Sequence, residues 1–232
     1  MKTKAHFIQG SYPKQELIRE FLSYDVQIPE LCVLQPINEF GTLTLALVST
    51  MHWSRQYELG WAIDVANLQK DDIVLDAGCA YSTTKYAAAK RCKKVVGIDL
   101  SEDYLKKARK GCDILGINNV ELHKADIAKY KSWNKFDKVF CLSVLEHEPD
   151  EENKYKCIEN MIDLLKPGGF LILSYDIIRE IKPQVDFFID QRISDTILKM
   201  LEQERLVYGE APFSGTVGDH TLVTVCCAYQ KN

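Results

Sequence analysis

The stretch VLDAGCAYS, residues 74–82, is the most informative part of this sequence. The apolar run at 73–75 predicts a buried strand, and the spacing of residues 84–91 predicts a helix directly after the turn around Gly78. In open α/β sheets, ligands bind beyond the carboxyl ends of the strands, near the point where the strand order reverses. A strand, a tight turn and a helix in this order therefore predict a ligand-binding turn.

Outward from this stretch, short apolar runs alternate with helix-length segments. Strict alternation implies a parallel sheet that is covered by helices on both faces. We therefore expect an α/β, Rossmann-like, doubly wound domain with a mostly parallel seven-stranded sheet. Besides the first strand at 73–75, strands are predicted at 95–98, 120–122, 139–142, 170–174, 206–208 and 221–229, with a loop at 209–219.

A carboxylate follows the second predicted strand, at Asp99 in the stretch GIDLS. Asp99 lies 23 positions after Asp76 (99 − 76). A carboxylate about 20 residues beyond such a turn can accept hydrogen bonds from both hydroxyls of an adenosine ribose. The position of Asp99 therefore indicates a nucleoside cofactor.

The turn holds a single glycine, whereas a dinucleotide-binding turn needs several. Ala80 and Ser82 occupy the later glycine positions, and their side chains would crowd a pyrophosphate. S-adenosylmethionine has no phosphate and tolerates this loss better. Asp76 is also placed to orient the ammonium end of a bound amino acid, whereas an anion-binding turn has little use for a carboxylate. These residues favour S-adenosylmethionine over a dinucleotide.

The composition limits the partners and the location. The chain has 232 residues, of which 46% are hydrophobic and 27% charged, as in ordinary globular proteins with one core. Its net charge of −4 offers no basic surface to nucleic acid. Neither a signal peptide nor a run of about 18 apolar residues is visible, so we expect a cytoplasmic protein without a membrane span. The eight cysteines include no C-x-x-C pair, and no metal site is expected.

Five segments of the sequence follow one another in this order: VLDAGC, VVGIDLS, KADI, FDKVFCLSVLEHE and LLKPGGFLILS. They resemble, in turn, the first motif, the acidic second motif, the adenine-contacting loop, the fourth-strand motif and the turn into the fifth strand of class I S-adenosylmethionine-dependent methyltransferases, over roughly residues 54–230. The stretch MHWSRQYELGWAI before the first motif further resembles methyltransferases of polysaccharide or other secondary biosynthesis.

The resemblance implies a methyltransferase domain over residues 54–232 that takes S-adenosylmethionine and releases S-adenosylhomocysteine. Asp126 is expected to receive the exocyclic amine of adenine, although it could instead cap a short helix. The helix before the first strand is expected to close over the cofactor. The implied cofactor-binding residues are Arg55, Tyr57, Asp76, Gly78, Ala80, Asp99, Leu100, Asp126, Ile127, Leu142 and Ser143.

One residue departs from the family pattern. The family usually keeps glycine where this chain has Ala80. Alanine is a mild change if its φ angle is negative and a costly one if φ is positive. The departure therefore bears on cofactor affinity more than on the fold.

His147 is the candidate catalytic residue. It follows the fourth predicted strand, where an acceptor would meet the methyl group, and a neutral imidazole can take a proton from a hydroxyl or an amine. The alternative is a structural role, since a Glu-His pair is common here even where no base is needed. The expected reaction is an in-line displacement at the sulfonium methyl by a small or medium-sized acceptor, with water excluded.

Residues 1–53 do not follow the strand-helix alternation. A short helix is predicted at 15–21, after which Pro29 and Pro36 interrupt the chain. We expect this part to be a helical extension that covers the mouth of the site.

Two other functions stay open at this point. A catalytically silent relative would act as a binding subunit, and a nucleotide-cofactor oxidoreductase would share the fold, because fold alone does not fix chemistry. The sequence leaves open the identity of the acceptor, whether oxygen, nitrogen or carbon is methylated, and the oligomeric state.

Overall fold

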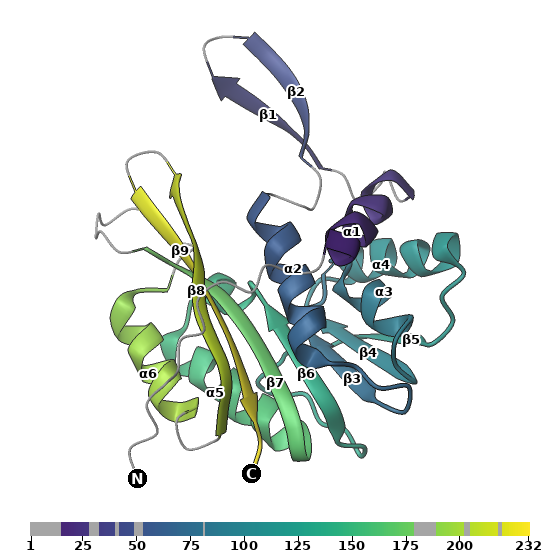
Figure 1. Cartoon of the computed structure of the whole chain (residues 1–232), viewed down its shortest axis with the longest axis vertical. Helices are drawn as coiled ribbons and strands as arrows, with labels where there is room; N and C mark the ends of the chain where they lie inside the picture. Colours follow the sequence, from purple (N-terminus) through teal and green to yellow (C-terminus); the bar gives the residue numbers. More distant parts are fainter. Residues whose placement is uncertain are drawn as a thin grey trace.

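The structure is a computed structural model of the chain, and it forms a layered α/β arrangement (Figure 1). The described residues are 15–27, 33–39, 42–48, 53–80, 82–178, 189–201, 205–217 and 220–232.

Seven strands form one mixed sheet in the described part of the chain: β3 (Ile73–Ala77), β4 (Lys94–Asp99), β5 (Val120–Lys124), β6 (Phe136–Leu142), β7 (Leu165–Ile178), β8 (Arg205–Val217) and β9 (His220–Gln230). Their order is β5-β4-β3-β6-β7-β9-β8. β9 runs antiparallel to β7 and β8, and the other pairings are parallel. The strand order reverses between β3 and β6. At such a point the loops that follow the two strands run in opposite directions, which leaves a crevice for a ligand at the carboxyl ends of the strands. The predicted fold class is confirmed.

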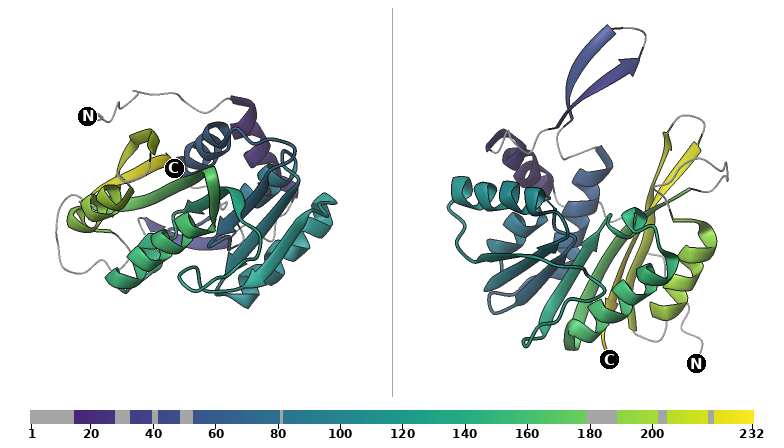
Figure 2. Two further views of the ribbon diagram at one scale, coloured as in Figure 1. Left: turned by 90° about the horizontal axis from the view of Figure 1, so that it is seen from below. Right: turned by 180° about the vertical axis from the view of Figure 1, so that it is seen from behind.

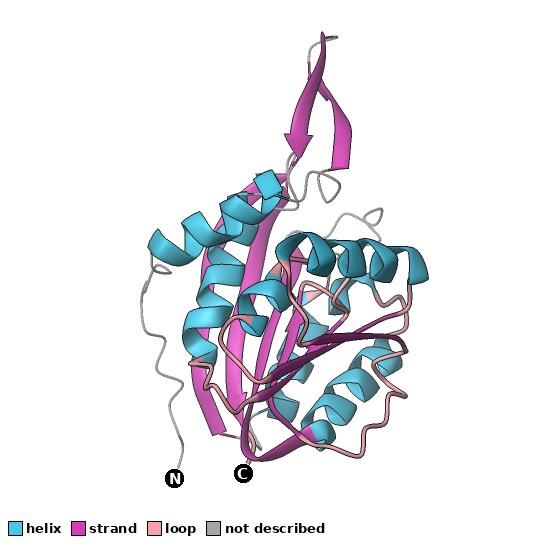
Figure 3. Ribbon diagram, turned by 90° about the vertical axis from the view of Figure 1, so that its right-hand side faces the viewer, coloured by secondary structure: helices cyan, strands magenta, loops and turns pink. Residues whose placement is uncertain are grey.

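Helices cover both faces of the sheet (Figure 3). Successive side chains of a strand point to opposite faces, so Val74 belongs to one core and Leu75 to the other. The core around Val74 lies under α2 (Trp53–Ala66) and α3 (Thr84–Ala89), and it also includes Cys112 of α4 (Glu102–Leu115). The core around Leu75 lies under α5 (Glu151–Leu164) and α6 (Gln191–Leu201).

The start and end of α4 follow from two residues. The Ser101 hydroxyl accepts a hydrogen bond from the Tyr104 N–H at 3.3 Å, as an N-cap does. Gly116 ends the helix with φ +64°, a left-handed conformation that glycine adopts without strain. The cap at Ser101 fixes the chain directly after Asp99, the last residue of β4.

The N-terminal part holds one helix and one hairpin. The helix is α1 (Gln15–Gln27), longer than the predicted 15–21. The hairpin consists of β1 (Val33–Glu39) and β2 (Thr42–Val48), and it projects from the rest of the molecule (Figure 2). The extension is therefore not wholly helical, because Pro36 lies in a two-stranded ribbon, where each strand is an edge that tolerates a missing N–H. The division at residues 53 and 54 stays a prediction.

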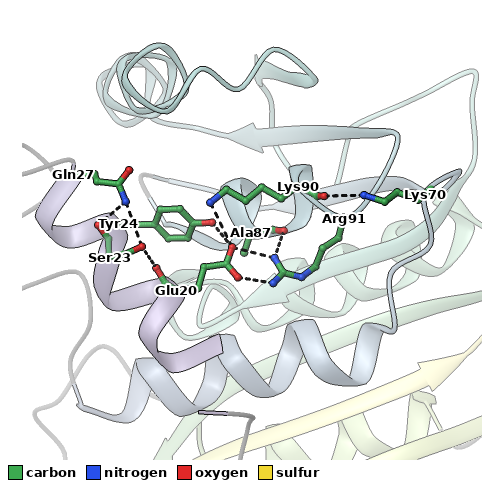
Figure 4. A network of polar contacts seen from close by, with 8 residues as sticks. All are labelled: Glu20, Ser23, Tyr24, Gln27, Lys70, Ala87, Lys90 and Arg91. Carbon is green, nitrogen blue, oxygen red and sulfur yellow. Dashed lines mark hydrogen bonds and ion pairs between the residues drawn. The ribbon is translucent and has the colours of Figure 1, made fainter. Parts of the chain in front are cut away.

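A polar cluster links α1 to the residues that directly follow α3 (Figure 4). Arg91 donates to both carboxylate oxygens of Glu20, at 3.1 and 2.5 Å, and the Tyr24 hydroxyl donates to Glu20 at 2.6 Å. Burial alone would raise the pKa of Glu20, but the hydrogen bonds from Arg91 and Tyr24 outweigh it and lower that pKa. Beside the cluster, Phe21 and Tyr24 are fully buried, and the Tyr24 ring packs edge-on against Tyr86.

The predicted loop at 209–219 was wrong for most of its length. Strand β8 continues to Val217, and its register against β9 shifts between Leu206 and Tyr208 and again between Glu210 and Phe213. Such irregularities accommodate residues that a regular ladder excludes, here Pro212. Pairing with β9 thus overrides the local glycine and proline signals.

Candidate active site

A cavity of about 590 Å³ opens at the carboxyl ends of β3, β4 and β6. It lies where the strand order reverses, as expected for an open α/β sheet. Nine of the predicted site residues line it: Gly78, Ala80, Asp99, Leu100, Asp126, Ile127, Leu142, Ser143 and His147. Its other lining residues are Leu59, Ser82, Thr83, Tyr104, Ala125, Val144, Leu145, Glu148 and Cys157.

Gly78 is the first residue of the turn after β3. Its φ is +71°, and a Cβ atom added there would lie 2.5 Å from the side chain of Val144. The N–H groups of Gly78 and Cys79 both donate to the Ile98 carbonyl at 2.9 Å. Only glycine satisfies both the backbone angle and the space at this point.

Ala80 has a φ of +37°. The sequence left two outcomes for this residue, and the structure shows the costly one, because an L-residue with positive φ is strained. Its N–H donates to Asp99 Oδ2 at 2.8 Å. The turn therefore keeps a glycine-like conformation without the glycine.

Asp99 ends β4 and holds the loops on both sides of it. Its Oδ2 accepts from the Ala80 N–H and its Oδ1 from the Ser101 N–H, each at 2.8 Å. A carboxylate offers about four lone-pair sites, so acceptor capacity remains for ligand hydroxyls. Next to it, the apolar side chain of Leu100 is 64% exposed and lines the cavity.

Asp126 caps a helical turn, which is one of the two roles that its sequence position allowed, and its expected contact with adenine stays a prediction. Its Oδ1 accepts from the Ala128 N–H at 2.9 Å, and its carbonyl accepts from the N–H groups of Lys129 and Tyr130. This is the local capping pattern of a helical turn. The residue also lines the cavity, next to Ile127.

Asp76 is buried in β3, just before the turn, and it does not line the cavity. Its side chain is 3% exposed, and Oδ2 has no hydrogen-bond partner among the described residues. Burial raises the pKa of Asp76 to about 6, with the Lys85 charge opposing the rise and the Asp99 charge adding to it. Its expected contact with the cofactor stays a prediction.

Two predicted residues, Arg55 and Tyr57, belong to α2. Their side chains lie outside the described part of the structure. The neighbouring residues Glu58 and Leu59 are described and buried, and Leu59 lines the cavity. Helix α2 thus borders the site, as the sequence predicted for this segment.

His147 ends a short 3₁₀ helix, Leu145–His147, that follows β6. It is exposed and lines the cavity. An exposed imidazole at the wall of a cavity is accessible to a bound acceptor, which a general base requires.

Sequence reasoning missed a buried polar cluster around Glu58. The hydroxyls of Ser143 and Ser174 both donate to Glu58 Oε1, the first at 2.8 Å. Ser143 has a φ of +51°, and its N–H donates to the Ser174 carbonyl at 3.0 Å. The cluster fixes the chain just beyond β6. No periodicity marks Glu58, because its partners lie 85 and 116 residues away.

Lys85 was also missed. It lies in α3, is 0% exposed, and donates to the carbonyls of Cys79, at 3.0 Å, and Ser82. The one available signal was a lysine inside the small-residue helix TKYAAA.

The described residues contain no group of three or more His, Cys, Asp or Glu side chains that could hold a metal ion. None of their helices is long and apolar enough to cross a bilayer. The described cysteines are buried and form no disulfide with one another. Burial raises the pKa of the Cys157 thiol, at the cavity wall, to about 12.

This combination of sheet order, turn and strand-end carboxylate defines a class I methyltransferase. The family model described as a methyltransferase domain matches residues 68–212, more than half of the chain. The chain therefore belongs to the S-adenosylmethionine-dependent class I methyltransferases, and the resemblance seen in the motifs is confirmed.

A curated relative and two solved structures illustrate the likeness. Ubiquinone biosynthesis O-methyltransferase of Shewanella sp. (strain ANA-3) is 33% identical over 134 residues, 55% of this chain and 52% of that protein. The N-methyltransferase NodS from Bradyrhizobium japonicum WM9, in complex with S-adenosyl-L-homocysteine, superposes with a TM-score of 0.59 at 17% identity, over 77% of this chain and 86% of NodS. The [4+2]-cyclase SpnF reaches a TM-score of 0.66 at 14% identity, over 93% of each chain.

These likenesses have defined limits. This chain spans about half the length of the curated relatives that it matches. The structural likenesses are below 25% identity and show the fold. Because a cyclase shares this fold, the reaction has to be argued from the site.

Proposed function

We propose that this chain transfers a methyl group from S-adenosylmethionine to an oxygen atom of a small or medium-sized acceptor, by direct in-line displacement. The observation that carries the proposal is the cavity at the strand reversal, with the Asp99 carboxylate at its wall. The choice of oxygen rests on the O-methyltransferase relative. We further propose that the protein works in the cytoplasm.

The residues of the cavity fit this cofactor. Asp99 has acceptor capacity for ribose hydroxyls, and Leu100 and Ile127 offer apolar surface to a flat base. Thr83 lines the cavity and is 1% exposed, and its hydroxyl has no hydrogen-bond partner among the described residues. Gly78 lets a ligand approach the backbone closely. When bound, the cofactor supplies an electrophilic methyl group on a positively charged sulfur atom.

The chain's own contribution is chiefly positioning. Transfer needs the two reacting atoms in line, about 3 to 3.5 Å apart, with water excluded. Glu58 fixes Ser143 beyond β6, and we assign to this strand end the placement of the acceptor. His147 takes the proton that the acceptor oxygen loses.

The acidic balance of the chain argues against a nucleic-acid acceptor. The oxidoreductase alternative loses its basis, since the family model and the curated relatives are methyltransferases. A silent binding subunit is the remaining rival.

The test is calorimetric titration of the protein with S-adenosylmethionine, S-adenosylhomocysteine and NADH. We expect roughly micromolar binding of the first two, no binding of NADH, and at least about tenfold weaker binding by Asp99→Ala, which lacks the charged acceptor. Release of S-adenosylhomocysteine in the presence of hydroxyl-bearing aromatic compounds and of matched amines would then separate oxygen from nitrogen transfer. Folded protein that binds neither sulfur compound contradicts the proposal, and binding with no turnover favours the silent subunit.

A further inference from the structure

Lys85 is a fully buried cation beneath the cofactor turn. Its side chain is 0% exposed, and it lies in a short helix whose other residues are also buried. Removing an ammonium group from water is costly unless it gains hydrogen bonds or an opposite charge. The partners of Lys85 therefore indicate what the charge does.

Those partners belong to the turn. Lys85 Nζ donates to the carbonyls of Cys79, at 3.0 Å, and Ser82. The ammonium also lies 5.0 Å from the centre of the Tyr86 ring. Both carbonyls flank the strained residue Ala80, one directly before it and one two residues after it.

The Cys79–Ala80 peptide group is held from both sides by charges. Its carbonyl accepts from Lys85, and its N–H donates to Asp99 Oδ2 at 2.8 Å. A peptide group is planar, so fixing its C=O and N–H directions fixes the whole plane. The φ angle of Ala80 is the rotation about its N–Cα bond, and it relates this plane to the carbonyl carbon of Ala80. The two charges therefore favour the positive φ that alanine otherwise avoids.

We propose that Lys85 is a positioning residue of the cofactor site, which together with Asp99 holds the Cys79–Ala80 peptide in its binding orientation and so replaces the missing glycine. Without the ammonium, the peptide can rotate and Ala80 can return to negative φ. The Ala80 N–H would then lose its hydrogen bond to Asp99, and the shape of the turn would no longer match the bound cofactor. The inference rests on the proposed cofactor, but it also predicts a coupling that is measurable without any ligand.

The experiment is a double-variant cycle with Lys85→Met and Ala80→Gly. Each variant, the double variant and the wild type are titrated with S-adenosylhomocysteine by calorimetry and unfolded with denaturant. We expect Lys85→Met to weaken binding by at least about tenfold, because two charge-assisted hydrogen bonds are lost. Ala80→Gly should restore most of that affinity in the Lys85→Met background, because glycine adopts positive φ without help from the ammonium. Lys93→Met, an exposed lysine outside the turn, is the matched control and should bind normally.

The outcomes are distinct. Normal binding by Lys85→Met overturns the inference, and so does a loss that Ala80→Gly fails to rescue, since a general role in packing would not depend on residue 80. If Lys85→Met alone does not fold, the double variant decides: recovery of folding supports the inference, and a double variant that stays unfolded overturns it. If the wild type does not bind S-adenosylhomocysteine, the proposed function fails, and the unfolding cycle still tests the coupling between the two positions.

Discussion

At the scale of single residues, Gly78 is the glycine at which we expect a substitution to be most damaging. Gly78→Ala would place a Cβ atom 2.5 Å from Val144 in a left-handed conformation. We expect it to lower the free energy of unfolding by about 2 kcal/mol or more and to abolish cofactor binding. Gly116→Ala is the control, because Gly116 also has positive φ but open space around it; it should cost about 1 kcal/mol and leave binding intact. Denaturant unfolding and calorimetry measure both, and equal effects would contradict the prediction.

His147 tests the chemistry separately from binding. If it takes the acceptor's proton, His147→Ala should lower kcat about 100-fold or more. Its affinity for S-adenosylhomocysteine should stay within about twofold of the wild type, since Asp99 is untouched. A variant with normal kcat would leave His147 as a structural residue.

Asp76 gives the stability a pH dependence of unusual sign. Its pKa is raised from 3.8 to about 6, mainly by burial. The folded protein therefore holds this proton more tightly than the unfolded chain, and the stabilisation from protonated Asp76 is lost as pH rises through this range. Relative to Asp76→Asn, the wild type should lose up to about 3 kcal/mol between roughly pH 4 and pH 7. Denaturant unfolding across that range measures it, and a constant difference would show that Asp76 does not titrate there.

At the scale of elements, α1 depends on the ion pair of Glu20 and Arg91. Because the pKa of Glu20 is lowered, the ionised pair contributes stability above the ordinary range near 4.5, and this contribution is lost as pH falls through the lowered pKa. Glu20→Gln should lower the free energy of unfolding by about 1 kcal/mol and speed hydrogen exchange in residues 15–27. Glu16→Gln, on the exposed side of the same helix, should change neither. Equal exchange in both variants would mean that apolar packing alone holds α1.

The sequence predicted the elements whose signal is local. The apolar runs predicted six strands of the sheet and a short part of β8, and Ser101 and Gly116 marked the ends of α4, because caps act within one turn. Strand β8 was mostly misassigned, since its pairing with β9 is a long-range contact that outweighs Gly209 and Pro212. The hairpin was not predicted, although β2 has the alternating sequence TLTLALV that is typical of a strand.

The same distinction holds for the candidate site. Residues at the ends of strands, such as Asp99 and His147, could be predicted because the topology brings those ends together. Lys85 and Glu58 could not, because their roles depend on which backbone carbonyls and hydroxyls the folded chain turns toward them. Whether the predicted residues bind the cofactor stays a prediction.

At the scale of the whole molecule, ligand binding and folding should be linked. A ligand that binds only the folded state stabilises it, by about 2.7 kcal/mol at 100 times its Kd. S-adenosylhomocysteine at that excess should therefore raise the Tm of the wild type by several degrees. Asp99→Ala at the same concentration should show little increase. Differential scanning calorimetry measures both, and a wild-type Tm that does not move would show that the folded protein does not bind the ligand at this concentration.

The position of β9 has a consequence for synthesis on the ribosome. β9 follows β8 in the chain but lies between β7 and β8 in the sheet, and β8 pairs with no other described strand. As the polypeptide is made, the strands that carry the turn and Asp99 emerge before β8 and β9 and can pair at once. β8 must wait, unpaired, until β9 has been translated. The half of the sheet that holds the predicted cofactor residues can therefore assemble while the nascent chain is still growing, and the opposite edge closes last.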